Sequence, residues 1–359
     1  MTEIIVIGGG IAGLSAAARL SGEAKVTVLE QETATGYHAS GRSAALFEEN
    51  YGLPGTVALN RASKAYHLDA NGGYLSPRGF LIVADAEQAE TFRTDVKTLG
   101  LDPITPEQAL KFVPILDADQ LAFVGYHADA LDIDTDRMMQ DYAREIRHNG
   151  GQILTRCGVR TITKNATNWA VTAGDKVIEA DMLVNAAGAW VDIIAEMAGI
   201  APIGITPRRR SMARIPAPAG HDVSTWPMFF GAGETWYAKP DAGALLVSPA
   251  DADPVEPHDA WADDMVLAEG IARYEKMVTV PVTRVQTTWA GLRSFAPDGE
   301  LVLGPDPEEP TFVWAAGQGG YGIQSAPAAS QLVADLALGR RPEIPEDIIP
   351  YLTPDRLKT

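Results

Sequence analysis

Three glycines near the N-terminus have the spacing of a phosphate-binding turn. Gly8, Gly10 and Gly13 form a GxGxxG pattern between an apolar run at 4–7 and a segment rich in alanine and leucine at 11–20. The first glycine permits a tight turn, the second lets a pyrophosphate approach the backbone, and the third lets a helix pack closely against the strand. The unpaired N–H groups and positive dipole end of that helix then face the phosphates.

An acidic residue follows at the position where a ribose would be held. The apolar stretch 26–29 predicts a second strand, and Glu30 follows it, 17 residues after Gly13. A carboxylate there accepts hydrogen bonds from a ribose hydroxyl and disfavours a 2′-phosphate. The order of strand, glycine turn, helix, strand and acid predicts a dinucleotide site, to which the adjacent Ala12 and Gln31 also belong. A glycine turn without a ligand would not account for Glu30.

The length and charge of the chain limit its class. With 359 residues it exceeds the usual size of one compact domain, so we expect a cofactor domain and an interleaved substrate domain. The net charge of −18 repels phosphate backbones and anionic lipid, and nucleic acid is therefore not an expected partner. The charge itself is expected to serve solubility.

Cysteine content and hydropathy indicate a compartment. The single Cys157 allows neither an internal disulfide nor a multi-cysteine metal site, and no metal site is expected. The N-terminus lacks a charged region followed by an apolar core, and no stretch approaches the roughly 18 apolar residues of a membrane span. We therefore expect a cytoplasmic protein with no transmembrane segment.

The loop after the second strand decides which dinucleotide is bound. The residues GYHASGRSAA, at 36–45, form a small-residue loop with one arginine. Glu30 followed by this stretch resembles the D-amino-acid oxidase superfamily of flavoproteins, in which the segment runs along the pyrophosphate and the flavin. The resemblance implies non-covalent FAD; the alternative is a Gly/Ser loop with a solvated arginine. The implied flavin-side contacts are Gly41, Arg42, Ser43, Ala44 and Ala45.

Further motifs extend the resemblance over essentially the whole chain. The stretches VNAAGAW (184–190), TWAGLRSF (288–295) and QGGYGIQ (318–324) are similar to those of D-arginine and related D-amino-acid dehydrogenases. For 187–188, a simple strand-to-helix turn is the alternative to a cofactor contact. The cofactor contacts that these motifs and the turn after residue 156 imply are Val159, Ala187, Gly188, Trp190, Gly319, Gly320, Tyr321, Gly322, Ile323 and Gln324.

The elements that must position these residues alternate between helical and strand-like patterns. The clearest helix is predicted to follow Asp134 as its cap, with Met138, Tyr142 and Ile146 on one buried face. The expected fold class is α/β (α+β), with a Rossmann-type FAD-binding domain and an interleaved antiparallel-sheet substrate domain. Segments 1–50, 134–200 and 294–345 are expected to form the FAD-binding domain, 51–133 and 201–293 the substrate-binding domain, and 346–359 a C-terminal tail.

The resemblance also assigns a catalytic set. Arg293 matches the position that binds a substrate carboxylate, for which a bidentate arginine is well suited, and Arg210 matches a second arginine. Tyr237 is implied near the carboxylate, and Tyr51 is implied in the pocket wall. Gly320 and Gln324 are implied at the flavin edge and in the substrate pocket. Alternatives are a structural ion pair for Arg293, replacement of Arg210 by Arg208 or Arg209, and a packing role for either tyrosine.

Two departures from the arginine-selective enzymes predict the substrate. Phe80 stands where an acid would pair with a basic side chain, and Leu46 stands where a histidine can occur. Because an apolar wall leaves a cationic side chain without compensation, we expect neutral or hydrophobic substrates. None of the six histidines has a spacing that marks it as a catalytic base.

The expected reaction is oxidative deamination of a D-amino acid to the 2-oxo acid and ammonia, by hydride transfer from Cα to flavin N5. The electron acceptor, whether oxygen, a quinone or a carrier, stays open. One alternative is a secondary-amine oxidase of the sarcosine, glycine or proline type, and another is a 2-hydroxy-acid dehydrogenase. A third is a flavin-holding electron-transfer subunit of a larger complex.

Overall fold

A six-stranded sheet forms one end of the molecule. The structure is a computed structural model that describes residues 1–358. Five strands of this sheet are parallel, and β19 is antiparallel to its neighbour β20. In order across the sheet, the strands are β19 (Val302–Pro305), β20 (Phe312–Ala316), β13 (Met182–Asn185), β1 (Glu3–Ile7), β2 (Lys25–Leu29) and β9 (Gln152–Leu154).

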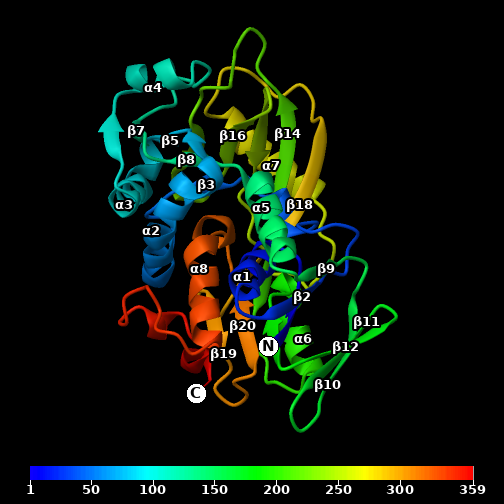
Figure 1. The fold of residues 1–359 in the computed structure, drawn as a ribbon. Coiled ribbons are helices and arrows are strands. Elements are labelled where there is room, and N and C mark those ends of the chain that lie inside the picture. The colour runs from blue at the N-terminus through cyan, green and yellow to red at the C-terminus, as the bar shows by residue number, and fades with distance from the viewer. Residues whose placement is uncertain (359) are drawn as a thin grey trace.

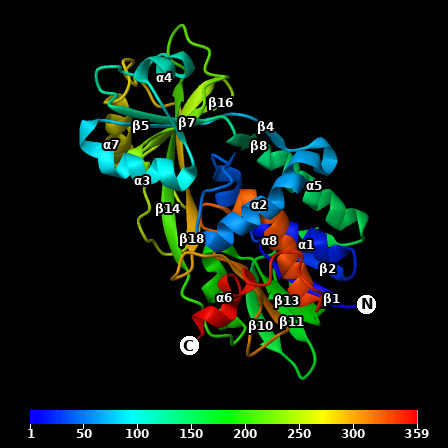
Figure 2. The same cartoon turned by 90° about the vertical axis from the view of Figure 1, so that its left-hand side faces the viewer.

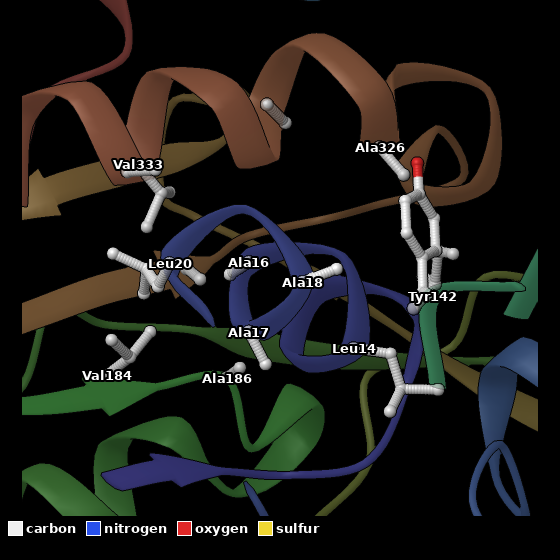
Figure 3. Packing of buried hydrophobic residues seen from close by; sticks show 14 of the residues in the cluster. Leu14, Ala16, Ala17, Ala18, Leu20, Tyr142, Val184, Ala186, Ala326 and Val333 are labelled. Carbon is white, nitrogen blue, oxygen red and sulfur yellow. The ribbon is translucent and has the colours of Figure 1, made fainter. Parts of the chain in front are cut away.

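Three helices pack beside this sheet and one another. Helix α1 (Ile11–Ser21) connects β1 to β2 and contacts both α5 (Thr135–His148) and α8 (Gly322–Ala337). Its small residues let α8 approach closely, and Figure 3 shows Ala16 to Ala18 of α1 between Val333 of α8 and Val184 of β13. The central parallel strands β1, β13 and β20 are almost fully buried, as expected for a sheet with helices against its face.

A second sheet of eight strands lies at the opposite end (Figure 1). It is antiparallel except where β15 runs parallel to β5. Its longest pair, β14 and β18, stays in register from Thr206 opposite Phe295 to Arg214 opposite Thr287. In order, the strands are β18 (Thr287–Phe295), β14 (Thr206–Pro216), β17 (Ala244–Ser248), β16 (Tyr237–Asp241), β15 (Met228–Gly231), β5 (Phe80–Ala84), β7 (Phe123–His127) and β6 (Asp102–Ile104).

Smaller elements complete the fold. One three-stranded meander comprises β10 (Val159–Lys164), β11 (Trp169–Ala173) and β12 (Lys176–Ala180), and another small sheet comprises β3 (Leu46–Phe47), β8 (Leu131–Ile133) and β4 (Leu75–Pro77). The remaining α-helices are α2 (Pro54–Asp69), α3 (Ala89–Leu99), α4 (Pro106–Phe112), α6 (Val191–Met197) and α7 (Asp264–Glu275). The short 3-10 helices include η1 (Ala39–Arg42), η4 (Gly188–Trp190) and η5 (Ala232–Glu234).

This architecture confirms the expected mixed α/β fold class. The six-stranded sheet draws strands from 3–29, 152–185 and 302–316, and the eight-stranded sheet draws them from 80–127 and 206–295. Both termini lie at the end of the molecule that holds the six-stranded sheet (Figure 2). The expected domain boundaries stay a proposal. Strand β18 runs across the expected boundary at residue 293, and Leu352 of the C-terminal tail is fully buried.

The predicted helix after Asp134 is present. The Asp134 side chain accepts a hydrogen bond from Arg137 N at 3.1 Å, and Met138, Tyr142 and Ile146 are buried. Within residues 1–358 no helix has both the length and the apolar character that crossing a membrane requires. The same residues contain no group of three or more His, Cys, Asp or Glu side chains arranged as metal ligands.

Candidate active site

The turn between β1 and α1 needs its glycines for steric reasons. Gly8 has a φ of 111°, and a Cβ there would lie 2.3 Å from the Ala186 carbonyl oxygen. A Cβ on Gly13 would lie 1.9 Å from the Gly8 carbonyl oxygen, so any side chain at Gly13 would push α1 away from the turn. Ser40 Oγ accepts the Ile11 N–H of α1 at 2.9 Å, and no acidic residue occupies the first turn.

The Glu30 carboxylate is held in a fixed orientation beside this turn. It is buried, and its two oxygens accept hydrogen bonds from Gly9 N and Glu32 N, each at 2.8 Å. Carboxylate oxygens can accept further hydrogen bonds, and Glu30 borders a cavity. Its position at the end of β2 therefore suits a ribose hydroxyl.

Two adjoining cavities meet at the N-terminus of α1. The larger has a volume of about 610 Å³ and the smaller about 210 Å³. They share Gly10, Ser40, Arg42 and Gly188 among their lining residues, and Gly188 has open space where a Cβ would stand. An elongated ligand can therefore run past the glycine turn from one cavity to the other, as a dinucleotide would.

Nearly all the predicted cofactor contacts line these cavities. Gly13 and Gly41 line neither cavity. Gly13 shapes the glycine turn, and Gly41 shapes the 36–42 loop, where a Cβ on Gly41 would lie 2.4 Å from the Gly36 carbonyl oxygen. The smaller cavity, which we call the cofactor cavity, is lined by Gly8, Gly10, Glu30, Gln31, Arg42, Val159, Ala187, Gly188 and Trp190. The larger, the substrate cavity, is lined by Gly10, Ala12, Arg42, Ser43, Ala44, Ala45, Gly188, Gly319, Gly320, Tyr321, Gly322, Ile323 and Gln324.

Arg42 borders both cavities, but its guanidinium is engaged within the protein. It donates to the carbonyl oxygens of Tyr37, Ala260 and Ala290 at 2.9–3.1 Å, and to Asp259 Oδ1 at 2.6 Å. These bonds tie the 36–42 loop to the segment that precedes α7 and to β18. Most of the donor capacity of Arg42 is therefore used before any ligand binds.

Arg210 and Arg293 differ from Arg42 in this respect. They project from the same face of the β14–β18 pair, where Arg210 lies opposite Gly291 and Arg293 lies opposite Arg208, and both line the substrate cavity. Among residues 1–358 neither forms an ion pair, and the buried Nε atom of each has no hydrogen-bond partner. Two partly buried cations that form no ion pair indicate an anionic ligand.

The competing arginines of the same strand are already engaged. Arg209 points to the other face and pairs with Asp251 at 3.1 Å and Asp253 at 3.2 Å. Arg208 donates to the Ala252 carbonyl oxygen at 3.2 Å and does not line the cavity. Of the three consecutive arginines, Arg210 is therefore the one available to a ligand.

Two tyrosines stand near this pair of arginines. Tyr237 is buried, and the centre of its ring lies 5.8 Å from Arg210 Cζ. The Tyr51 hydroxyl donates a hydrogen bond to Glu234 Oε1 at 2.8 Å. Burial and the Glu234 carboxylate raise the pKa of Tyr51 far above its ordinary value, so its phenol stays protonated. Both tyrosines line the substrate cavity.

An apolar wall forms another side of the substrate cavity. It contains the predicted Phe80 and Leu46, and the Phe80 ring lies 4.4 Å from the ring of Phe230. The other members were not predicted, because they belong to β5, β14 and β15, where an apolar side chain indicates burial but not which cavity it faces. These are Ile82, Met212, Met228 and Phe230.

Three carboxylates in the cavity lining were not predicted: Glu48, Asp95 and Glu234. Glu48 is buried and pairs with His127 at 2.6 Å; burial opposes protonation, but this hydrogen bond and the charge of Glu48 raise the pKa of His127 above its ordinary value. Asp95 of α3 accepts the Gly233 N–H at 2.7 Å and so holds the turn that carries Glu234. No local spacing in the sequence marks these acids, because the tertiary fold brings them together.

Comparison with known proteins agrees with this geometry. A family model described as FAD dependent oxidoreductase (DAO) matches residues 3–336. A protein from Bos taurus named FAD-dependent oxidoreductase domain-containing protein 1 is 23% identical over 94% of this chain and 81% of its own length. Glycine oxidase from Bacillus licheniformis is 24% identical over 94% of this chain and 93% of its own.

A solved structure shows the same fold. L-proline dehydrogenase from P. horikoshii superposes with a TM-score of 0.84 at 23% sequence identity, over 99% of this chain and 98% of the other. The family model covers most of the chain, and the glycine turn, Glu30 and the adjoining cavities fit its cofactor. The chain therefore belongs to the DAO family of FAD-dependent oxidoreductases.

Proposed function

We propose that the protein oxidises the Cα–N bond of a D-amino acid with a neutral or hydrophobic side chain, giving the 2-oxo acid and ammonia. The observation that carries this proposal is the pair Arg210 and Arg293, which line the substrate cavity and form no ion pair within residues 1–358. Two guanidinium groups on one face of a sheet suit a carboxylate, which can accept two parallel hydrogen bonds from an arginine. The D configuration rests on the resemblance of the sequence motifs.

The remaining lining residues fit the other parts of such a substrate. We assign the carboxylate to Arg293 and Arg210, with Tyr237 beside it, and the side chain to the apolar wall around Phe80 and Leu46. Tyr51 stays a neutral phenol and closes the cavity from the side of Glu234. Holding the carboxylate at one end and the side chain at the other would fix the direction in which the Cα hydrogen points.

The cofactor is assigned to the residues that line both cavities. Glu30 would hold the ribose, the α1 N-terminus with Gly8 and Gly10 would hold the pyrophosphate, and Gly319 to Gln324 would border the flavin ring. When bound, FAD supplies a ring that accepts two electrons from the substrate. The α8 N-terminus, which begins at Gly322, would stabilise negative charge nearby.

The substrate amine must lose a proton before oxidation. No histidine is among the described residues that line the substrate cavity. We therefore propose that the rate follows ionisation of the amine itself and rises as pH increases toward the pKa of that amine. A rate that loses this dependence when a single histidine is replaced would contradict the proposal.

Oxidation of a small or secondary amine is the second candidate, because the similar proteins include a glycine oxidase and an L-proline dehydrogenase. Anaerobic mixing of the FAD-loaded protein with single D- and L-amino acids, glycine, sarcosine and proline separates the two. We expect loss of the yellow flavin absorbance with D-leucine or D-methionine and little change with the others. Bleaching by sarcosine, glycine or proline alone would favour the second candidate, and bleaching by L-isomers would overturn the stereochemistry.

If an amino acid reduces the flavin of the purified protein, the protein is an enzyme by itself, and the alternative of an electron-transfer subunit of a larger complex is removed.

We propose a cytoplasmic location, for which the single, unpaired Cys157 is the support.

Mixing the reduced protein with oxygen, and separately with a quinone analogue, distinguishes the electron acceptors that the proposal admits. Faster reoxidation by oxygen would identify an oxidase, and faster reoxidation by the quinone would identify a dehydrogenase.

A further inference from the structure

Helix α2 carries a buried polar stripe. Thr56, Asn60, Ser63 and His67 recur at intervals of three and four residues, so they share one face of the helix, and each has 0% of its surface exposed. A buried helix face is ordinarily apolar, and a buried polar group destabilises the fold unless it is hydrogen-bonded. The hydrogen-bond partners of these four side chains therefore show which parts of the protein the stripe holds.

The first member joins α2 to the segment between β18 and β19. The N-cap residue Leu53 provides no side-chain cap, and the Glu300 carboxylate takes that role from a distant part of the chain. It accepts hydrogen bonds from Gly55 N at 2.6 Å, from Thr56 N at 2.9 Å and from Thr56 Oγ1 at 2.7 Å. A carboxylate at this end also complements the helix dipole, so the start of α2 is fixed.

The second member holds a strand-to-helix connection that lines the substrate cavity. Asn60 Nδ2 donates to the carbonyl oxygens of Tyr51 at 3.0 Å and Glu49 at 3.4 Å. The Asn60 Oδ1 atom is buried and has no partner among the described residues. An amide with only one end engaged costs stability, whereas its engaged end fixes the backbone of Tyr51, which lines the substrate cavity.

The last two members bind helix α8 close to Pro327, which lies inside that helix. Proline has no N–H and crowds the carbonyl four residues before it, which weakens the helix there. The Gln324 carbonyl and the Ala328 N–H are each bonded by α2: His67 Nε2 donates to the Gln324 oxygen at 2.8 Å, and Ser63 Oγ accepts from Ala328 N at 3.1 Å. The Ser63 hydroxyl also donates to the Ser325 carbonyl at 3.2 Å.

Gln324 links this arrangement to the cavity. Its Oε1 atom accepts the Glu48 N–H at 2.9 Å, and its Nε2 atom donates to the Tyr51 carbonyl at 3.4 Å. Its backbone is held by His67, and the Tyr51 backbone is held by Asn60. Two facing walls of the substrate cavity are thus bonded to each other and to the same stripe.

We infer that the polar stripe of α2 positions Gln324, Tyr51 and the start of α8 around the flavin and the substrate. His67 is its central positioning residue, because it alone holds the Gln324 backbone from α2. Burial lowers the pKa of His67 to about 4, so the ring is neutral near pH 7 and carries its proton on Nε2, facing the carbonyl. The effect on substrate binding rests on the proposed function, whereas the effect on FAD does not.

The test compares His67→Leu, which removes the donor, with His67→Gln, whose amide can replace it. Leu59→Ala is the matched control, since Leu59 is a fully buried apolar residue of the same helix. We expect His67→Leu to weaken FAD binding about tenfold, to shift the visible absorption spectrum of the bound flavin, and to raise KM more than it lowers kcat. His67→Gln should restore all three, and Leu59→Ala should lower the melting temperature without shifting the spectrum.

The possible results of these measurements separate a positioning role of the stripe from a purely structural one. If His67→Leu keeps the wild-type spectrum and FAD affinity, or if Leu59→Ala changes them equally, the stripe is structural and the inference is wrong. If His67→Leu changes the flavin properties but no amino acid reduces the wild-type protein, the inference holds and the proposed function fails. FAD titration of the apoprotein provides the affinity in every case, independently of catalysis.

Discussion

The cofactor cavity and the substrate cavity are built by different means. The cofactor cavity is lined by short contiguous stretches such as 7–10, 36–40 and 186–190, and its Gly8 cannot carry a side chain because a Cβ would lie 2.3 Å from the Ala186 carbonyl oxygen. The substrate cavity shares part of that lining and adds side chains from β5, β14, β15, β16 and β18 of the other sheet and from α3 and α8. In the cofactor cavity, steric contact with the backbone restricts the residue types that fit. In the substrate cavity, ligand binding depends on which charged side chains have no partner within the protein.

The arginines show the same contrast. Arg42, at the junction of the cavities, has three carbonyl partners and a carboxylate, while Arg210 and Arg293 have no anionic partner within residues 1–358. Residue type alone does not separate them. What separates a structural arginine from a ligand-binding one is whether its donors are already used.

Replacing Arg293 should produce the largest effect. Arg293→Ala removes one of the two cations assigned to the carboxylate, and we expect kcat/KM for D-leucine to fall about 10³-fold, or about 4 kcal/mol, because truncating one partner of a desolvated charge pair costs 2–5 kcal/mol. FAD content should stay near the wild-type level, since the residues assigned to the ribose and the pyrophosphate lie in the cofactor cavity, which does not include Arg293. Steady-state kinetics and the flavin-to-protein absorbance ratio measure both.

Arg293→Lys provides the matched control, because it keeps the charge but loses the bidentate geometry. It should recover only part of the loss. Unchanged kcat/KM in Arg293→Ala would remove the substrate assignment while leaving the cofactor assignment in place.

Replacing Gly13 should act on the other cavity. Gly13→Ala places a Cβ within 1.9 Å of the Gly8 carbonyl oxygen, so α1 must move away from the phosphate-binding turn. Overpacking of this kind costs about 1–3 kcal/mol, and we expect FAD affinity to fall about 100-fold in a titration of the apoprotein. Gly22→Ala, at the other end of α1, is the control: Gly22 has ordinary helical dihedrals and nothing within 4 Å of the added Cβ. Equal FAD affinity in both variants would contradict the steric explanation.

The cofactor cavity was the more predictable part of the molecule. Gly8, Gly10 and Glu30 could be predicted because each local conformation permits few residue types, and all three lie where the pattern placed them. Choosing Arg210 over Arg208 and Arg209 required the tertiary fold: Arg208 shares its face with Arg210, and only their partners in the neighbouring strand and loop distinguish them.

Other features had no readable signal in the sequence. The polar stripe of α2 has the spacing of a solvated helix face, and nothing local shows that α8 covers it. Glu234 adopts a φ of 52° in the turn between β15 and β16, and it borders the substrate cavity only because Asp95 of α3 holds that turn. Such residues are specified by contacts between distant segments rather than by neighbours in the chain.

Arg42 offers a smaller effect that tests the contrast between the arginines. Arg42→Met removes four internal hydrogen bonds, and we expect the free energy of unfolding to fall by about 2 kcal/mol while KM for D-leucine changes less than about threefold. Chemical denaturation and steady-state kinetics measure the two quantities. Arg341→Met, at an exposed arginine, is the control and should leave both unchanged. A large rise in KM without loss of stability would show that Arg42 acts directly on the substrate.

Glu234 should give the smallest effect, because its side chain is exposed at the edge of the substrate cavity. Its negative charge opposes entry of a second anionic group, so Glu234→Gln should raise kcat/KM for D-glutamate about three- to fivefold, the range of an exposed charge interaction. The value for D-leucine should change less, since its side chain is neutral. Glu49→Gln makes the same charge change outside the cavity lining and should alter neither value. An equal rise for both substrates, or in both variants, would show that the net charge of the protein rather than the position of Glu234 governs selection.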